Sequence, residues 1–314
     1  MIIGYIIAAA AGLSTAMQAS ANAETRRLIK SPYLVAAINF IVSIAVLVVI
    51  IAAVWHNFSI PLAEVAKYPP WIWIGGACGP VVIMTNSLCI PKLGSARQMM
   101  LASTAQVIAG LLIDQFGMFG QQQIGMNLAR AVGAALVIGG IFVSAIDKNA
   151  EKIKKSDNII SVFVLLAIVN GTAASVQVAA NGTLNTVVDN FAKTALISMT
   201  VGLITTTALM IVVSAVRGGR AIFEEGGSFE KVRMSRYMIY GGTLAVIVVG
   251  GNAIAANILG TGLVNIMNLA GMMATSLVID ATGFLGIDKK PVTAAKVAGM
   301  IMIIAGTAVI SLIA

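Results

Sequence analysis

Stretches of about 20 apolar residues, the length that spans a bilayer as a helix, recur along the whole chain. A segment that crosses lipid must satisfy its backbone hydrogen bonds internally, which leaves α-helices and closed β-barrels. The alternation of apolar and polar residues that marks barrel strands is absent. The chain is 59% hydrophobic and 10% charged, whereas soluble domains carry about 25% charged residues. The sequence therefore predicts an all-α integral membrane protein.

The apolar segments predict ten transmembrane helices. Their approximate ranges are 3–22, 33–54, 71–90, 96–113, 128–146, 159–181, 192–215, 237–256, 262–279 and 293–313. The first segment ends in Ala21, Asn22 and Ala23, the small-x-small pattern of a signal peptidase site, although no basic residue precedes it. By itself, this segment could be a cleaved signal peptide or the first membrane helix.

An internal repeat decides the status of the first segment. An offset of 159 residues places GLSTAMQASAN, which begins at Gly12, on GTAASVQVAAN, which begins at Gly171. A signal peptidase site would not be duplicated in mid-chain. We therefore expect the first segment to be a retained helix.

The repeat continues to the end of the chain. After an insertion of seven residues the offset becomes 166, so that Asp114 in LLIDQFGMFG falls on Asp280 in LVIDATGFLG, and Arg130 falls on Lys296. Two halves, 1–146 and 159–314, are joined by a charged linker, 147–158. Because each half has five helices, an odd number, the second half enters the membrane from the opposite side. The sequence thus predicts two inverted repeats, a usual construction of secondary transporters.

Basic residues are distributed unequally between the two sides of this predicted topology. All of the 20 Lys and Arg residues except Lys67, Arg130 and Lys193 fall on the side that carries the linker. The positive-inside rule makes that side cytoplasmic and both termini extracytoplasmic. The net charge of +8 then reflects membrane topology, and we expect no binding of nucleic acid.

Several motifs are shared with a known family of membrane proteins. They are the first helix with its glycine and two amides, PPWIWIGGACGP at 69–80, PKLG at 91–94 and IDQFGMFG at 113–120. On these motifs the chain resembles the YdcZ-like family of the drug/metabolite transporter (DMT) superfamily. The resemblance implies the DMT (EamA-like) fold, with two five-helix units fused in one chain. PKLG has become NILG at 257–260, which suggests that the halves have specialised.

Amide side chains inside the predicted helices are the candidates for binding a substrate. Buried amides need hydrogen-bond partners, so they must face other helices or an aqueous cavity. One alternative is that they only join helices together. The other is that inverted symmetry brings the first helices of both halves, and their amides, together at a central site. The candidate residues are Gln18, Asn22, Gln177, Asn181, Asn86, Asn252 and Gln106.

Two pairs of charged residues at segment ends have unfavourable positions on their own helices. Asp114 and Asp280 end helices, and Arg130 and Lys296 begin the next ones, against the helix dipole in each case. Both pairs are sixteen residues apart. We expect Asp114 to meet Arg130, and Asp280 to meet Lys296, as exposed ion pairs that act as braces or gates. The glycines of the two IDxxGxxG motifs are candidate hinge or turn positions: Gly117, Gly120, Gly283 and Gly286.

Together, these features predict that the protein is a carrier and that it is not an enzyme. No acidic residue lies well inside a segment, and the sequence shows no metal-binding cluster, catalytic triad or cofactor motif. A neutral site rich in amides suits a small polar metabolite that is uncharged or zwitterionic. We expect alternating access, export as the direction, a prokaryotic inner-membrane location and function as a monomer, with a homodimer left open. The alternatives are a membrane scaffold that transports nothing and a passive pore.

The charge distribution yields a prediction about topology. A reporter enzyme that is active only in the cytoplasm should be inactive when fused after Ala314, and the same reporter inserted in the 147–158 linker should be active, because the basic side is retained in the cytoplasm. Activity of the C-terminal fusion would mean that the number of crossings or the orientation is wrong.

Overall fold

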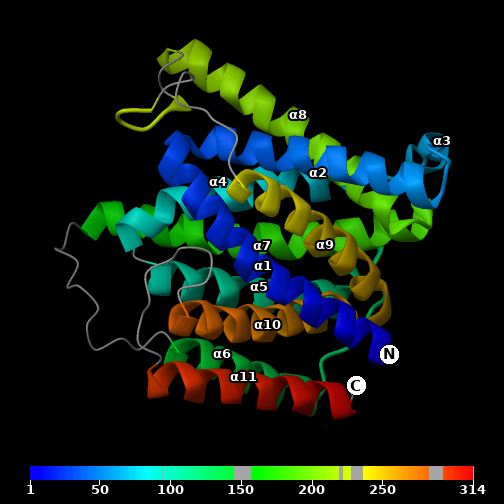
Figure 1. The fold of residues 1–314 in the computed structure, drawn as a ribbon. Coiled ribbons are helices and arrows are strands. Elements are labelled where there is room, and N and C mark those ends of the chain that lie inside the picture. Colours follow the sequence, from blue (N-terminus) through cyan, green and yellow to red (C-terminus); the bar gives the residue numbers. More distant parts are fainter. Residues whose placement is uncertain (94, 145–156, 219–221, 228–235, 283–292, 314) are drawn as a thin grey trace.

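The computed structural model describes residues 1–93, 95–144, 157–218, 222–227, 236–282 and 293–313. Over these residues every regular element is a helix (Figure 1). The helices are α1 (Ile2–Ile29), α2 (Pro32–Val54), α3 (Leu62–Val65), η1 (Pro70–Trp73), α4 (Ile74–Leu93), α5 (Ser95–Phe116), η2 (Met118–Gly120), α6 (Leu128–Ser144), α7 (Asp157–Val188), α8 (Phe191–Arg217), α9 (Arg236–Leu259), α10 (Thr261–Thr282) and α11 (Ala294–Ile313).

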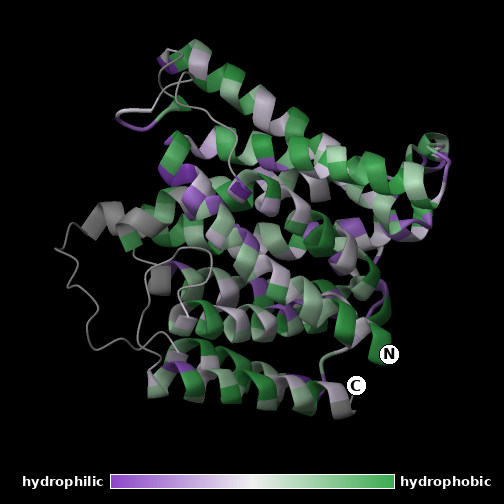
Figure 2. Cartoon of the chain, in the orientation of Figure 1, coloured by the Kyte–Doolittle hydropathy of each residue, from purple (hydrophilic) through white to green (hydrophobic). Residues whose placement is uncertain are grey.

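Each predicted membrane segment corresponds to one long helix. Within the described residues, eight helices are long and apolar enough to cross a bilayer, and Leu128–Ser144 is a shorter apolar helix. Their outward faces carry large apolar side chains, for example Ile6, Leu165 and Ile211, which are 64%, 61% and 64% exposed. The apolar residues cover the bundle along most of its length (Figure 2). A soluble protein would bury such side chains, so these faces are suited to lipid.

Local signals fix where the helices turn. Lys30 ends α1 in a left-handed conformation, and its backbone N–H donates to Arg26 O at 2.7 Å. Ser31 then caps α2, because its hydroxyl accepts from Leu34 N and Pro32 occupies the first turn. The tight connection brings α1 and α2 into an antiparallel hairpin.

The first helix of each half packs against the other half. α1 lies between α9 and α10, and α7 lies between α4 and α5. α2 packs against α8, and α6 packs against α11 at the edge of the bundle (Figure 1). The first helix is therefore an integral part of the fold, as the repeat predicted.

Glycines allow these helices to approach closely, and they do so at repeat-equivalent positions. A Cβ atom at Gly12 would collide with the backbone of Asn268, and one at Gly171 would collide with the backbone of Ala102. Under the two offsets, each contact maps onto the other. Small residues at such crossings let membrane helices gain van der Waals contact that lipid cannot supply.

A second set of glycine contacts shows the same correspondence. A Cβ at Gly242 would lie 2.5 Å from Val42 Cβ, and one at Gly76 would lie 2.6 Å from Val201 Cβ. These positions again correspond under the offsets that relate the two halves of the sequence. The two halves thus use the same contacts to join their helices.

The glycine crossings give a stability prediction. Replacing Gly12 or Gly171 by Ala should lower the free energy of unfolding by about 1–3 kcal/mol, because rigid backbone must move apart. Gly139→Ala in α6 is the matched control, since the only close neighbour of its new methyl group is the flexible end of Met302 at 3.1 Å. Thermal unfolding in detergent would measure all three. Equal losses of stability at the three positions would contradict the assignment of Gly12 and Gly171 to close helix crossings.

Candidate functional site

The predicted amides of the first helix lie where three helices meet. Gln18 Nε2 donates to Asn39 Oδ1 at 3.3 Å, and Asn39 Nδ2 donates to Asn22 Oδ1. Ser43 Oγ, one turn further along α2, donates to Gly242 O at 2.8 Å. This amide cluster joins α1, α2 and α9.

The equivalent amides of α7 face α4. Asn181 is 2% exposed, and its Oδ1 lies against Gly75, which leaves no space there for a Cβ atom. Within the described part of the chain this oxygen has no hydrogen-bond partner. Gln177 is partly buried, with its Nε2 3.3 Å from the position that a Cβ of Gly79 would take. An unpaired amide oxygen is costly in an apolar medium, so Asn181 holds unused hydrogen-bonding capacity.

Among the described residues no hydrogen bond joins the two amide pairs, so their convergence at a central site stays a prediction. Gln18 and Asn22 belong to the contact of α1 with α9, and Gln177 and Asn181 belong to the contact of α7 with α4. The glycine at each contact, Gly241 or Gly75, makes room for an amide between two crossing helices.

Asn86 and Asn252 are two further predicted amides. Each joins the third long helix of its half to the fourth, α4 to α5 or α9 to α10. Gln98 Nε2 donates to Asn86 Oδ1 at 3.1 Å, and Asn268 Nδ2 donates to Asn252 Oδ1 at 2.9 Å. Asn86 and Asn252 are repeat equivalents, so both halves connect their third and fourth long helices through paired amides. These contacts support the alternative that some of the predicted amides join helices.

Gln106 belongs to a cluster that spans α5, α7 and α10. Its Nε2 donates to Asn265 Oδ1 at 3.2 Å, and its backbone oxygen accepts from Ser175 Oγ at 2.9 Å and from Asn265 Nδ2 at 3.2 Å. Asn265 Nδ2 also donates to Ser175 Oγ. Ser175 and Asn265 are 0% and 1% exposed. The sequence alone did not single out Ser175, because a serine in an apolar helix is common.

The predicted contact of Asp114 with Arg130 is present, but it is buried and not exposed. Arg130 Nη2 donates to Asp114 Oδ2 at 2.6 Å, and the two side chains are 3% and 0% exposed. Thr261 N donates to Asp114 Oδ1 at 2.7 Å, and Gly262 N donates to Oδ2 at 3.0 Å. Arg130 Nη1 also donates to Ile124 O at 3.0 Å. One carboxylate thus connects α5, α6 and α10.

The position of Asp114 also resolves its apparent conflict with the helix dipole. The side chain ends α5 but reaches the first turn of α10, where free N–H groups and the positive end of the dipole favour an anion. Gly260, with φ of 80°, makes the turn into α10 and leaves room for the carboxylate. The neighbouring helix, which sequence spacing could not reveal, determines whether this charge is well placed.

The second charged pair lies partly outside the described residues. The side chain of Asp280 is among those that the structure does not describe, so its contact with Lys296 stays a prediction. The same holds for Gly283 and Gly286. In the first half Gly117 and Gly120 have φ of 60° and 70°, which confirms that they are turn positions.

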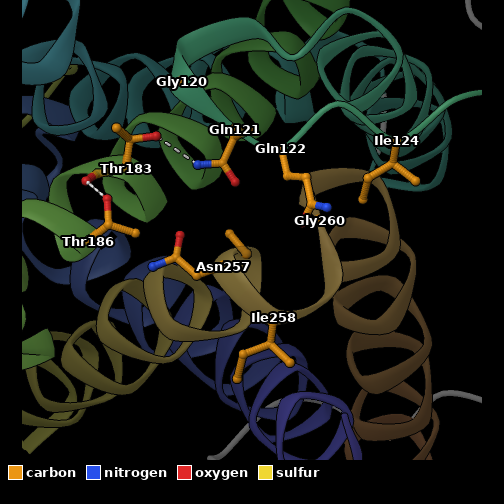
Figure 3. Close-up of a pocket in the computed structure, with 10 residues that line it drawn as sticks. Gly120, Gln121, Gln122, Ile124, Thr183, Thr186, Asn257, Ile258 and Gly260 are labelled. Carbon is orange, nitrogen blue, oxygen red and sulfur yellow. Dashed lines mark hydrogen bonds between the residues drawn. The ribbon is translucent and has the colours of Figure 1, made fainter.

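The segment after α5 folds over the end of α7 and lines a partly open pocket of about 160 Å³. Gln121 Nε2 donates to Thr183 Oγ1 at 2.8 Å and to Ala179 O at 2.9 Å, and Thr183 Oγ1 donates to Phe119 O at 2.6 Å. Asn257 lies on the opposite wall (Figure 3). The cavity is lined by Gly120, Gln121, Gln122, Ile124, Thr183, Thr186, Ala256, Asn257, Ile258 and Gly260.

The lining of this cavity is neutral and rich in amides and hydroxyls. Sequence analysis did not predict it, because Gln121 and Gln122 lie in a connection and Asn257 lies near a helix end. Among the residues that the structure describes, no group of three His, Cys, Asp or Glu side chains could hold a metal ion. Such a cavity can offer hydrogen bonds to an uncharged solute.

Comparison with protein families matches the chain over residues 3–143 and again over residues 162–309, to a family model described as "putative inner membrane exporter, YdcZ". The chain belongs to this family. The two matched ranges follow the two predicted halves, so the predicted resemblance to the YdcZ-like DMT proteins is confirmed. The chain is a multi-pass inner-membrane protein of an exporter family, which agrees with the expectation that it is not an enzyme.

Comparison with solved structures supports the fold. A chain named only "Crystal structure of protein" matches with a TM-score of 0.71 and 16% sequence identity, and the match covers 99% of this chain and 97% of the other. At this identity the likeness concerns the fold alone. No curated protein matches the sequence.

The buried carboxylate centre gives a second stability prediction. Asp114→Ala should lower the free energy of unfolding by about 3–5 kcal/mol, because Arg130 becomes a buried charge without its partner. The double variant Asp114→Ala with Arg130→Met should recover part of the lost stability, because the unpaired buried charge is then removed. The recovery should be incomplete, because the N–H groups of Thr261 and Gly262 still lack their acceptor.

Chemical unfolding of the two single variants and the double variant would test this coupling. Glu64→Gln is the control, since Glu64 and Lys67 form a pair whose side chains are 57% and 68% exposed, and exposed pairs contribute about 0–1 kcal/mol. Strictly additive losses for Asp114 and Arg130 would contradict the coupling.

Proposed function

We propose that the protein is a secondary transporter that moves a small polar solute, uncharged or zwitterionic, across the inner membrane by alternating access, with export as the direction. Membership in an exporter family supports transport in general. The neutral cavity and the buried amides support the class of solute, because amides pair with both donors and acceptors.

The proposal includes ten membrane crossings arranged as two inverted five-helix repeats. It is supported by the glycine contacts that recur at equivalent positions, such as Gly12 with Asn268 and Gly171 with Ala102. It is also supported by the arrangement of the first helices, each of which packs into the other half. Inverted repeats can exchange conformations, so that each half adopts in turn the shape of the other.

The observation that carries the proposal is the unequal burial of equivalent faces on α1 and α7. Val178 and Gly182 of α7 are buried, whereas their repeat equivalents Ala19 and Ala23 of α1 are exposed. Gly182 is covered by Gln121 and by residues of α9. One end of α7 is thus covered, whereas Ala19 and Ala23 on the equivalent face of α1 are exposed.

The open face of α1 points to a cytoplasmic entrance. Under the proposed orientation, the second half of α1 lies towards the cytoplasm and the second half of α7 lies towards the outside. We propose that the conformation is inward-open, with the segment after α5 covering the end of α7 beside the pocket of about 160 Å³. A transporter that takes its solute from the cytoplasm would adopt this conformation when no solute is bound.

Gln18 and Gln177 are the amides that we propose for solute contact. Both are partly buried, and they occupy equivalent positions on α1 and α7. Asn22, Asn86, Asn181 and Asn252 would shape the surrounding helix contacts. We propose a monomer as the functional unit, because both repeats are present in one chain.

Counterflow in proteoliposomes tests the transport proposal. Vesicles loaded with unlabelled solute should transiently accumulate labelled solute from outside, in a saturable manner, for at least one probe among uracil, asparagine and glucose. A carrier exchanges one solute molecule for another, whereas a passive pore gives linear flux without accumulation and a scaffold gives no flux. Absence of counterflow for all three probes would contradict the proposed class of solute.

Variants would then locate the site. Gln18→Leu and Gln177→Leu should each raise the half-saturating concentration of the active probe by about tenfold, the cost of roughly one hydrogen bond to a polar solute. Thr200→Val is the control, because Thr200 is exposed on α8 and bonds only to Leu196 O of its own helix, at 2.7 Å. Unchanged half-saturation in both glutamine variants would remove them from the site.

A further inference from the structure

Two amide side chains from distant parts of the chain meet over one glycine of α7. A Cβ atom at Gly182 would lie 2.9 Å from Gln121 Nε2 and 3.3 Å from Asn257 Oδ1. Gln121 follows α5, and Asn257 lies near the end of α9. Figure 3 shows the two side chains on facing walls of the pocket of about 160 Å³, hereafter the Gln121 pocket. The lack of a side chain at Gly182 leaves room between the two amides.

The amide of Gln121 is held in place while its oxygen is unused. Its Nε2 donates to Thr183 Oγ1 at 2.8 Å and to Ala179 O at 2.9 Å, and Thr183 Oγ1 donates to Phe119 O at 2.6 Å. In the part of the chain that the structure describes, Gln121 Oε1 has no hydrogen-bond partner. A fixed acceptor needs little reordering when it binds a donor, so it is well suited to recognition.

The other amides of the Gln121 pocket are not used by the protein. Asn257 and Gln122 line the pocket and are exposed, and their side chains make no hydrogen bond to any described residue. Each of these amides can both donate and accept. Ile124 and Ile258 add apolar surface to the same pocket. This combination suits a flat solute with polar edges and apolar faces.

The charge of the Gln121 pocket restricts the solute further. No charged side chain lines it. Asp114 lies behind its wall, with Oδ2 3.1 Å from the position that a Cβ of Gly260 would take, but this carboxylate is already paired with Arg130 and with two backbone N–H groups. An ionised solute would lose water here without gaining a counter-charge. The pocket therefore favours an uncharged solute.

The size of the pocket sets an upper limit on the solute. A cavity of about 150 Å³ holds a molecule of benzene, whereas sites for drug-sized ligands measure about 300–1,000 Å³. The volume of about 160 Å³ therefore fits a single six-membered ring.

We infer that the Gln121 pocket binds a small cyclic amide, a six-membered ring that carries an N–H beside a C=O, as uracil does. The inference deepens the proposed function and rests on it for the role of the pocket, which is to hold the solute at the end of α7 that faces the outside. Gln121 Oε1 accepts from a ring N–H, and the amides of Asn257 and Gln122 pair with the other polar atoms of the ring. Ile124 and Ile258 pack against its faces.

Among the three probes named above, this site selects uracil. Asparagine carries an ionised amino group and an ionised carboxyl group, for which the pocket has no counter-charge. Glucose is larger than benzene and carries hydroxyl groups around its ring, so it has neither the size nor the flat apolar faces that the pocket accommodates.

Binding of radiolabelled uracil to the purified full chain in detergent tests the pocket without transport. Equilibrium dialysis should show saturable binding. 1,3-Dimethyluracil, which has no N–H, should compete about tenfold more weakly than unlabelled uracil, the effect of losing roughly one hydrogen bond. Asparagine and glucose at the same concentration should not compete. Absence of saturable binding, or equal competition by all of these compounds, would overturn the inference.

Asn257→Leu and Gln122→Leu remove amides from the pocket without breaking a described hydrogen bond of the protein. Each should weaken uracil binding by about tenfold and leave the midpoint of thermal unfolding unchanged. Gln123→Leu is the matched control, because Gln123 is an exposed glutamine of the same segment that does not line the pocket, and its Nε2 donates to Gln115 O at 3.0 Å. The control should leave uracil binding unchanged. An equal loss of affinity in the control, or unchanged affinity in both pocket variants, would overturn the inference.

Gln177→Leu and counterflow keep this inference apart from the proposed function. If Gln177→Leu abolishes uracil binding while Asn257→Leu leaves it unchanged, uracil binds elsewhere in the bundle, so the pocket is wrong and the carrier stands. Counterflow of asparagine or glucose without counterflow of uracil would have the same meaning. If uracil binds as described and no probe gives counterflow, the pocket stands as a binding site and the carrier proposal fails.

Discussion

A polar group buried in this protein is costly unless it finds a partner inside the protein, because the surrounding lipid offers none. This constraint explains where the amides and the one described buried ion pair lie. Amides meet amides or backbone oxygens at helix crossings, as in Gln18 with Asn39 and Asn268 with Asn252. Glycines such as Gly75 and Gly241 supply the space for them. Polar contacts and small residues thus define the same crossings.

The carboxylate of Asp114 is the clearest product of this constraint. It accepts from a guanidinium and from two backbone N–H groups of a third helix, so a buried negative charge is fully paired. Breaking such a centre costs far more than breaking an exposed pair, because the remaining charge cannot reach water. The centre therefore fixes the positions of α5, α6 and α10 beside the pocket that Gln121 lines.

Duplication gave the halves the same helix crossings, and later divergence gave them different interiors. Gly12 and Gly171 make the same contact, but Ser175 and Asn265 correspond to Ala16 and Met99. A symmetric pair of halves would have two conformations of nearly equal free energy.

The sequence alone predicted the all-helical membrane fold and the positions of the long helices, and its internal repeat agrees with the two ranges that the family model matches. The reason is that bilayer thickness and backbone hydrogen bonding act on each segment separately, so apolar length and internal repetition suffice to predict them. The spacing of Asp114 and Arg130 also predicted their contact, since it depends on one helical hairpin. The tertiary structure decided everything that depends on helices distant in sequence. The cap that Asp114 provides to α10, the different partners of Gln18 and Gln177, the partners of Gln106 and the pocket beside Gln121 follow from which helices cross. That pairing is set by side-chain packing between the halves, which no local pattern in the sequence encodes.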